Sequence, residues 1–323
     1  MMSPMTSPFE HITDLYLPID NPTKLGFSYP DNQPLTREMY AGVLALVEAA
    51  KRKRTEDCNL TDGLVAFRST YMPTAGGGMY IMRKMPSHIL SMHDLGMPRV
   101  VTNHLLSERL LKGGLIIVSG NPGNGKSTSL AALIIERLKK YAGICITIED
   151  PIEMPLHGVH GKGVCLQRGV SGEEAFANAV RGALRAYPAK TNAMMMIGEI
   201  RDSETAALAL RSAVDGRLVM ISMHAGNVIQ SLLRLCSMAS KIVSSEEVRE
   251  LLASSFRMCL HQELVSVPGT TASRLKVDVL LDTQSVIGTI RSRNLMLDTL
   301  KNDVLQQRNW LRLNMPIELR KID

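Results

Sequence analysis

The stretch from Gly114 to Ser129, GLIIVSGNPGNGKSTS, holds residues whose types and spacing fit one kind of chemistry. Gly120, four further residues, then Gly125, Lys126 and Ser127 match the pattern G-x-x-x-x-G-K-[ST] without a gap. Glycines here let consecutive backbone N–H groups turn towards a phosphate chain, and a following helix directs its positive N-terminal end at the same point. We expect Lys126 to reach the β- and γ-phosphates and the Ser127 hydroxyl to bind Mg²⁺. The pattern therefore predicts a site for a nucleoside triphosphate.

The context of this loop favours a phosphate site over a glycine-rich turn with a surface lysine. The apolar run Leu115 to Val118 precedes the loop and predicts a buried strand, and Leu130, Leu133, Ile134 and Leu138 follow it at helical spacing. The residues expected to contact the nucleotide are Gly120, Asn121, Pro122, Gly123, Asn124, Gly125, Lys126, Ser127 and Thr128.

Carboxylates follow two later strands, where the attacking water and the metal of a bound triphosphate need partners. Glu149, Asp150 and Glu153 surround Pro151 after one apolar run, and Glu199 follows another, Met194 to Ile197. Acids before a proline also occur as ordinary turn caps, and Glu199 could be a solvated loop carboxylate. Upstream of it lies a phosphate loop, so we interpret Glu199 as functional.

A lone histidine, His224, stands at a third strand end in the string SMHA. Taken alone, such a histidine is more often a hydrogen-bonded structural residue.

Composition bounds the class of protein. The 323 residues suffice for two domains, and 45% hydrophobic with 21% charged residues is ordinary for a globular chain. No apolar run approaches the roughly 20 residues that cross a bilayer, and the N-terminus lacks the features of a signal peptide, so we expect cytoplasmic residence. Five scattered cysteines without a C-x-x-C pair suggest neither disulfides nor a zinc site. The net charge of +6 is compatible with a membrane surface, an acidic partner or nucleic acid.

The first hundred residues predict a small separate domain. The proline-rich residues 1–35 fit an extended, partly ordered arm. A helix is expected over 36–50, closed by the basic run KRKR, and a hairpin over 64–72 and 78–85. A short helical segment is expected after Pro86, and the domain boundary near residue 100.

The rest of the chain alternates strand and helix, which predicts a doubly wound α/β sheet with ligands at the carboxyl ends of its strands. Parallel strands buried on both faces are expected at 115–119, 144–148, 193–197 and 217–223. Ser171-x-x-Glu174 and Ser244-x-x-Glu247 look like helix capping boxes. Two more strands, 263–267 and 275–281, and a helix over 295–313 complete the domain of residues 101–323.

Four strings in this order resemble the secretion-ATPase family of type II and type IV traffic motors. They are GNPGNGKST as the Walker A box, TIEDPIE as the acidic box, GEIRD-x-ET as the Walker B box and SMHA as the histidine box. The segment from Phe67 to Pro98, which begins FRSTYMPTAGGGMY, resembles the part of the retraction motors that carries inter-subunit arginines. The likeness covers about residues 60–260.

The resemblance implies a PAS-like N-terminal domain, residues 36–100, joined to a RecA-like P-loop ATPase domain and assembled as a homohexamer. By position, Glu153 matches the catalytic glutamate, Glu199 the Walker B glutamate near Mg²⁺, and His224 the histidine that senses nucleotide state. Arg68 and Arg83 match arginines that reach the γ-phosphate, although strand arginines can also merely face solvent. The implied ligands are ATP and Mg²⁺, and the implied partners are inner-membrane components of a secretion, conjugation or pilus apparatus.

Three departures separate this chain from some branches of the family. Gly76 stands where the retraction motors carry an arginine, and Ala186-Tyr-Pro-Ala-Lys-Thr-Asn replaces an acidic Asp-Pro-Asp. The four-cysteine zinc insert of the type II and pilus-extension ATPases is missing. These departures favour a retraction, secretion or conjugation motor, with a lean towards secretion and conjugation, peripheral at the inner membrane.

Two other classes of function remain open at this point. A RecA-type nucleic-acid motor would share the ATPase core and suit the basic charge. Five phenylalanines, one tryptophan and no interleaving of basic and aromatic residues disfavour base stacking, so no direct nucleic-acid contact is expected. A scaffold that only binds nucleotide is disfavoured by the presence of Glu153 and Glu199.

Overall fold

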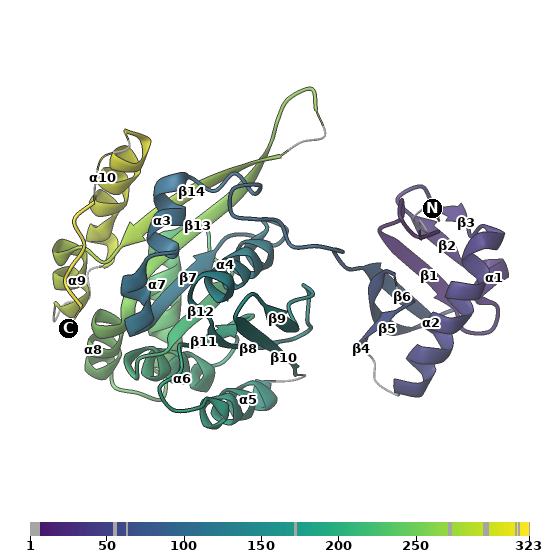
Figure 1. Ribbon diagram of the computed structural model, residues 1–323, viewed down its shortest axis with the longest axis horizontal. Coiled ribbons are helices and arrows are strands. Elements are labelled where there is room, and N and C mark those ends of the chain that lie inside the picture. The colour runs from purple at the N-terminus through teal and green to yellow at the C-terminus, as the bar shows by residue number, and fades with distance from the viewer. Residues whose placement is uncertain are drawn as a thin grey trace. The chain divides into compact units, whose positions relative to one another are not determined.

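The computed structural model describes residues 7–53, 57–62, 64–170, 173–270, 273–292, 297–313, 315 and 317–322. The chain divides into two compact units (Figure 1). The first comprises Met1–His88 and the short segment Pro151–Pro155, and the second comprises Ile89–Asp150 and Leu156–Asp323. The division falls between His88 and Ile89, not near residue 100 as the sequence suggests. Among the described residues, every helix is too short or too polar to span a membrane.

The first unit is a six-stranded antiparallel sheet of order β3-β2-β1-β6-β5-β4 with one long helix. That helix buries Val43, Leu46, Val47 and Ala50, a spacing that turns one apolar face to the sheet. The elements are β1 (Asp14–Pro18), α1 (Pro22–Leu25), β2 (Phe27–Tyr29), β3 (Gln33–Pro34), η1 (Arg37–Met39), α2 (Tyr40–Lys53), β4 (Asp57–Thr61), β5 (Ala66–Thr74) and β6 (Gly77–Lys84).

The expected extended arm over residues 1–35 is wrong where the structure describes it. Three strands lie in this region, and β1 pairs along its whole length with β6, from Asp14 opposite Arg83 to Pro18 opposite Met79. The prolines mislead because Pro18 ends its strand and Pro34 lies in the edge strand β3, places where a missing N–H costs no ladder bond. The helical segment expected after Pro86 is also wrong, since turns occupy that stretch.

The second unit is built on an eight-stranded sheet of order β14-β13-β7-β12-β11-β8-β10-β9, in which β9 and β14 at the two edges are antiparallel to their neighbours. Its elements are α3 (Arg99–Leu105), η2 (Glu108–Lys112), β7 (Gly114–Ser119), α4 (Lys126–Tyr141), β8 (Gly143–Glu149), β9 (Gly158–His160), β10 (Gly163–Gly169), α5 (Glu173–Ala186), β11 (Ala193–Ile197), α6 (Ser203–Val214), β12 (Leu218–Met223), α7 (Val228–Ala239), α8 (Ser245–Ser255), β13 (Phe256–Ser266), β14 (Ser273–Leu281), α9 (Gln284–Arg291), η3 (Leu297–Thr299) and α10 (Leu300–Arg312).

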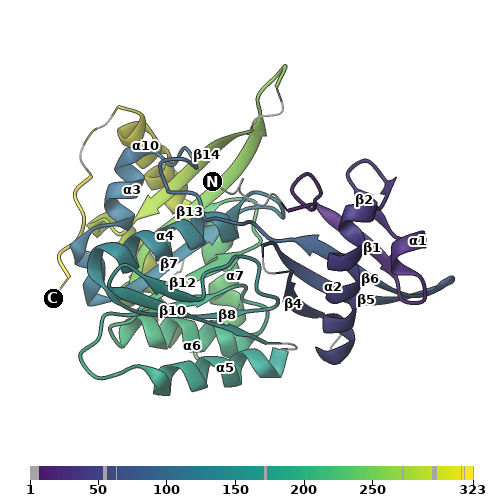
Figure 2. The same ribbon diagram turned by 45° about the vertical axis from the view of Figure 1, so that its right-hand side comes forward.

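The four parallel strands expected from the sequence are confirmed as β7, β8, β11 and β12, and they are adjacent in the sheet. All six residues of β7 and all six of β12 are buried. Figure 2 shows the reason, because α4 covers one face of the sheet while α5 and α6 cover the other. The cap at Ser244 is confirmed by its hydrogen bond from the Glu247 N–H, whereas Ser171 lies outside the described residues.

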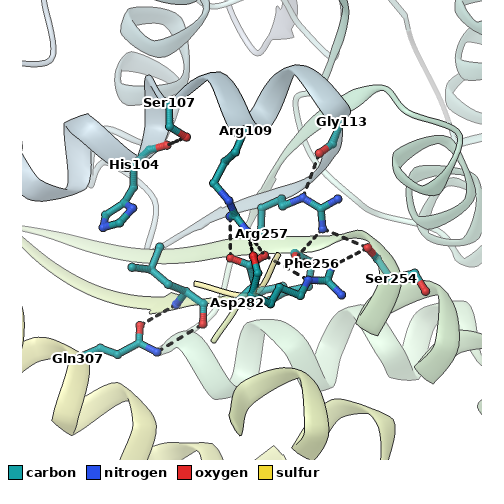
Figure 3. A network of polar contacts seen from close by, with 11 residues as sticks. His104, Ser107, Arg109, Gly113, Ser254, Phe256, Arg257, Asp282 and Gln307 are labelled. Atoms are coloured by element: carbon teal, nitrogen blue, oxygen red, sulfur yellow. Dashed lines mark hydrogen bonds and ion pairs between the residues drawn. The ribbon is translucent and has the colours of Figure 1, made fainter. Parts of the chain in front are cut away.

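A buried polar network lies in the second unit, between the residue after β14 and the residue before β7 (Figure 3). Asp282, fully buried after β14, accepts two hydrogen bonds from Arg109, at 2.8 and 2.9 Å, and a longer one of 3.4 Å from Arg320. Arg257 donates to the carbonyls of Gly113, Ser254 and Phe256. Burial lowers the pKa of Arg257 to about 10, with the nearby arginine charges adding to the effect. The network ties the C-terminal segment to the base of β7.

Candidate active site

The phosphate-type loop runs between β7 and α4, where the sequence places it. Gly120 has φ +152°, and a side-chain carbon there would lie 2.4 Å from the carbonyl oxygen of Gln262. Gly125, the residue directly before α4, has φ +74° in the left-handed region. Glycine is therefore required at the first position by the close approach of β13, and favoured at the second by its backbone angle.

Lys126 is buried at the first turn of α4, with 7% of its surface exposed. Its ammonium donates to the carbonyl oxygens of Gly120 and Asn121, both at 3.0 Å, and lies 3.3 Å from Nδ1 of His224. The side chain therefore folds back over its own loop, with the positive charge held between the loop and the end of β12. Such a charge suits an anion bound in the loop.

His224 connects this lysine to Glu199. Its Nε2 lies 3.5 Å from Oε1 of Glu199. An ammonium group can only donate, so Nδ1 of His224 must be the acceptor, and a neutral ring then carries its proton on Nε2, facing the carboxylate. The backbone of His224 is held as well, because its carbonyl accepts a 2.7 Å hydrogen bond from Arg234.

Arg201 holds the carboxylates of two strand ends together. Its Nε donates to Oε2 of Glu199 at 2.9 Å, and Nη1 donates to Oδ2 of Asp150 at 2.8 Å. The pKa of Arg201 is raised, chiefly by the hydrogen bond to Glu199. Without this cation, two negative groups would face one another at the edge of the sheet.

The polar chain follows the order of the strands. β7, β12, β11 and β8 are neighbours in the sheet, and the residues at or after their carboxyl ends are Lys126, His224, Glu199 with Arg201, and Asp150. Neighbouring strands lie about 4.8 Å apart, which a single side-chain contact can bridge. The sheet topology thus lines up cation, imidazole and carboxylates along one edge.

The start of α4 fits a phosphate group. Four other helices of this unit have an N-cap residue whose side chain accepts a hydrogen bond from a backbone N–H of the first turn. These N-caps are Asp202, Asn227, Ser244 and Thr283. The N-cap of α4 is Gly125, which has no side chain to accept such a hydrogen bond. Its first N–H groups therefore suit an external anion, favoured by the helix dipole.

The oxygen donors nearby fit magnesium. The Ser127 hydroxyl and the Glu199 carboxylate are hard oxygen ligands of the kind that Mg²⁺ prefers. Within the part of the chain that the structure describes, no group of three or more His, Cys, Asp or Glu side chains is arranged to hold a metal alone. Mg²⁺ commonly takes one or two protein oxygens together with phosphate oxygens and water, so this donor set suits a metal bound with a nucleotide.

A protein-family model described as type II/IV secretion system protein matches residues 53–294. The chain belongs to this family. The type IV pilus ATPase PilU of Pseudomonas aeruginosa is 31% identical over 263 residues, which cover 79% of this chain and 65% of PilU. The type IV pilus retraction ATPase PilT of the same bacterium is 32% identical over 273 residues, covering 80% of this chain and 72% of PilT. The chain thus spans just under two thirds of PilU's length.

Two solved structures share the fold. The crystal structure of the pilus retraction motor PilT with bound ADP matches with a TM-score of 0.72 and 25% identity, over 95% of this chain and 87% of PilT. The ATPase DotB of Legionella pneumophila matches in fold with a TM-score of 0.63 and 20% identity, over 93% of this chain and 84% of DotB. The predicted fold class, a RecA-like domain with a smaller N-terminal domain, is confirmed.

The remaining predicted site residues of this secretion-family chain lie in its first unit. Arg83 is 70% exposed and donates from Nε to Oδ1 of Asp14 at 2.9 Å. The pKa of Arg83 is raised, first by that hydrogen bond and, to a lesser degree, by the charge of Glu153. Glu153 is exposed and belongs to the segment Pro151–Pro155, which groups with this unit. The structure thus brings Arg83 and Glu153 into electrostatic reach of one another.

Arg68 lies directly opposite Arg83 in the β5–β6 pair. Its Nε is buried and has no hydrogen-bond partner among the described atoms. Two arginines in register on neighbouring strands repel one another, which is a cost to stability. Asp14, opposite Arg83 on the next strand, offsets part of that cost.

Sequence reasoning missed two residues of the site. Arg201 stands inside the quoted GEIRD string, two residues after Glu199, so its charge was a readable signal. Gln262 left no signal. It is 1% exposed on β13 and donates to the carbonyl of Asn124 at 2.6 Å, while the Asn124 side chain accepts from the Leu264 N–H. Asn124, expected to contact nucleotide, therefore directs its amide oxygen at β13.

Proposed function

We propose that this chain is the subunit of a hexameric, Mg²⁺-dependent ATPase that powers a type IV secretion, conjugation or pilus machine. The observation that carries the proposal is the polar chain from Lys126 through His224 to Glu199 beside a glycine loop. The family's relatives PilU and PilT are named as type IV pilus ATPases, and the PilT structure holds ADP. The loop, the cation and the acidic edge suit a nucleoside triphosphate, and the relatives named as ATPases make ATP our proposed substrate.

Each residue of the edge has a distinct role in the proposed hydrolysis. Lys126 neutralises charge on the β- and γ-phosphates, and backbone N–H groups of the loop hold the same oxygens. Ser127 and Glu199 hold Mg²⁺, directly or through its water shell; magnesium supplies charge neutralisation at the reacting phosphate. His224, with its proton directed at Glu199, links the position of that carboxylate to that of Lys126.

Glu153 polarises the attacking water, and the water's oxygen displaces ADP from the γ-phosphorus. In this step the bond from the γ-phosphorus to the bridging oxygen breaks, and the proton of the water passes to the carboxylate or to phosphate. Glu153 is exposed on a loop, where water and substrate can reach its carboxylate. The charges of Glu153 and Arg83 interact, and in our proposal both act on the same substrate.

The arginine pair supplies the positive charge that phosphoryl transfer needs beyond the lysine. Arg68 and Arg83 lie opposite one another on β5 and β6, where their like charges repel. An anion such as a γ-phosphate, of the same subunit or a neighbouring one, removes that repulsion. If a neighbour supplies it, the subunits of the ring cooperate.

The assembly and the machine are further parts of the proposal. We infer a ring of six chains, docked on inner-membrane components of a secretion, conjugation or pilus apparatus from the cytoplasmic side. The replaced arginine at Gly76 and the altered loop from Ala186 favour secretion or conjugation over pilus retraction. Light scattering of the nucleotide-bound protein is expected to give six times the mass of one chain.

Steady-state ATP hydrolysis by purified protein tests the activity. Lys126→Ala and Glu199→Ala are each expected to abolish turnover, because each removes a charge that faces the triphosphate or its metal. Lys139→Ala is the matched control, since Lys139 is exposed on the same helix α4. Normal hydrolysis by Lys126→Ala would show that the site is misassigned. Strong stimulation by single-stranded DNA would favour a nucleic-acid motor instead.

A further inference from the structure

Gln167 on β10 lies at the base of the loop that carries Glu153. This loop leaves β8 after Glu149 and ends at Leu156, so Glu153 stands near its middle. β10 is parallel to β8, with Gln167 in register with Thr147. The side chain of Gln167 therefore projects on the same side of the sheet as that of Thr147, two residues before the end of β8 at Glu149.

The amide of Gln167 bonds to both ends of the loop at once. Its Oε1 accepts from the backbone N–H groups of Leu156 and His157, both at 2.8 Å. Its Nε2 donates to Oε1 of Glu149 at 2.9 Å. Since two N–H donors face one end of the amide and a carboxylate faces the other, the orientation of the amide is fixed by its partners.

Glu149 gives this contact a rigid foundation. Its side chain is 4% exposed, and the same oxygen also accepts from the Thr147 hydroxyl at 2.6 Å. A buried carboxylate needs such donors, because a buried charge without hydrogen-bond partners is strongly unfavourable. The backbone of Glu149 is held too, by the hydrogen bond from the Val170 N–H to its carbonyl. The start of the loop is thus anchored through its side chain and main chain.

We propose that Gln167 is a positioning residue that clamps both ends of the Glu153 loop and so sets where that carboxylate lies. The proposal rests on the proposed ATPase function. Only six residues separate Glu149 from Leu156, and two of them, Pro151 and Pro155, have a fixed φ. Such a short, stiff loop passes a displacement of its ends on to its middle. A shift of about 1 Å in a catalytic group can cost on the order of a hundredfold in rate.

The structure offers a reciprocal exchange as the test. In Gln167→Glu, a carboxylate faces Glu149 where an amide donor stood, so the clamp opens by repulsion. In the double variant Glu149→Gln with Gln167→Glu, the donor and acceptor change places: residue 149 donates, and residue 167 still accepts from Leu156 and His157. The exchange keeps the net charge of the wild type and a hydrogen bond at each of the three contacts of residue 167, while the Thr147 hydroxyl, which donates to the same Glu149 oxygen, must turn to accept from the new amide.

We expect Gln167→Glu to lower kcat for ATP by roughly tenfold to a hundredfold. Affinity for ADP is expected to stay within about threefold of the wild type, because the phosphate loop is untouched. The exchanged double variant is expected to recover most of the lost kcat. Gln306→Glu, the same substitution at an exposed position on α10, is the control for the added charge.

Amide hydrogen exchange gives a readout that does not depend on hydrolysis. The N–H groups of Leu156 and His157 are expected to exchange faster in Gln167→Glu and at the wild-type rate in the exchanged variant. If the wild type does not hydrolyse ATP, the proposed function is wrong while the exchange rates still report on the clamp. The clamp has no positioning role if Gln167→Glu keeps wild-type kcat, or if kcat falls and the double variant fails to recover it.

Discussion

The substitution Asp282→Asn tests how much the buried polar network around Asp282 contributes to the stability of the second unit. Asp282 is the acidic member of a cluster with three arginines, Arg109, Arg257 and Arg320, and none of its surface is exposed. The substitution keeps the shape of the side chain but removes its charge. One of the two carboxylate oxygens becomes an NH2 group, which only donates and would face the arginine donors.

The expected loss follows from burial and hydrogen-bond geometry. Arg109 and Arg320 retain only 22% and 12% of their side-chain exposure beside this carboxylate, so solvent screens the pair weakly. Removing one partner of a buried ion pair typically costs about 3–5 kcal/mol. The remaining carbonyl oxygen of asparagine still accepts one hydrogen bond, which places our estimate near the lower end, about 3 kcal/mol. That is a large part of a native stability of roughly 5–15 kcal/mol.

Urea unfolding followed by circular dichroism measures the change. The matched control is Asp298→Asn, whose carboxylate pairs with Lys301 at 3.0 Å while both side chains are mostly exposed. Exposed pairs contribute at most about 1 kcal/mol, so the control is expected to unfold near the wild-type midpoint. If both variants unfold at the same urea concentration, Asp282 does not compensate the arginine charges and our reasoning about the network is wrong.

Two further outcomes are expected. Arg83→Ala lowers ATP turnover more than nucleotide affinity, because Arg83 is proposed to act on the charge that develops during transfer; an equal loss in both, measured by steady-state kinetics and ADP binding, would contradict this. Burial, followed by the charge of Arg109, lowers the pKa of His104 from its ordinary 6.5. As the pH falls, the unfolded chain therefore takes up a proton at His104 before the folded chain does. The contribution of His104 to stability is complete above pH 6.5 and is lost as the pH drops towards the folded pKa. His104→Asn is expected to flatten this part of the pH profile of stability, measured by urea unfolding between about pH 7.5 and 5.5.

Local patterns in the sequence predict the parts of the site that are contiguous in the chain. The phosphate loop is readable because the chemistry of a triphosphate dictates residue types within about eight consecutive positions. The strand ends that carry Glu199 and His224 are readable because parallel strands buried on both faces give long apolar runs. Their convergence on one edge then follows from β-α alternation, without any knowledge of side-chain contacts.

Contacts between distant segments are not readable in the same way. Asp14 and Arg83 are neighbours only because β1 pairs with β6, and no periodicity in a proline-rich segment announces that pairing. Gln167 reaches Glu149 only because of the register between β10 and β8. A shift of one residue would turn the amide to the other face of the sheet, so the clamp depends on register that the sequence alone does not display.

The order of strands in the sheet places four polar side chains in one continuous run of contacts. Lys126, His224, Glu199 and Arg201 form a single run of contacts of 3.3, 3.5 and 2.9 Å across neighbouring strands. Each contact fixes the donor or acceptor role of the next: the ammonium makes Nδ1 of His224 an acceptor, and the neutral ring then offers its proton to Glu199. In the proposed function, a bound phosphate competes with Nδ1 of His224 for the Lys126 ammonium, so a change at the phosphate loop reaches the ring that faces Glu199. His224 contacts both Lys126 and Glu199, so among the described residues of this edge it stands between the phosphate loop and the proposed metal ligand.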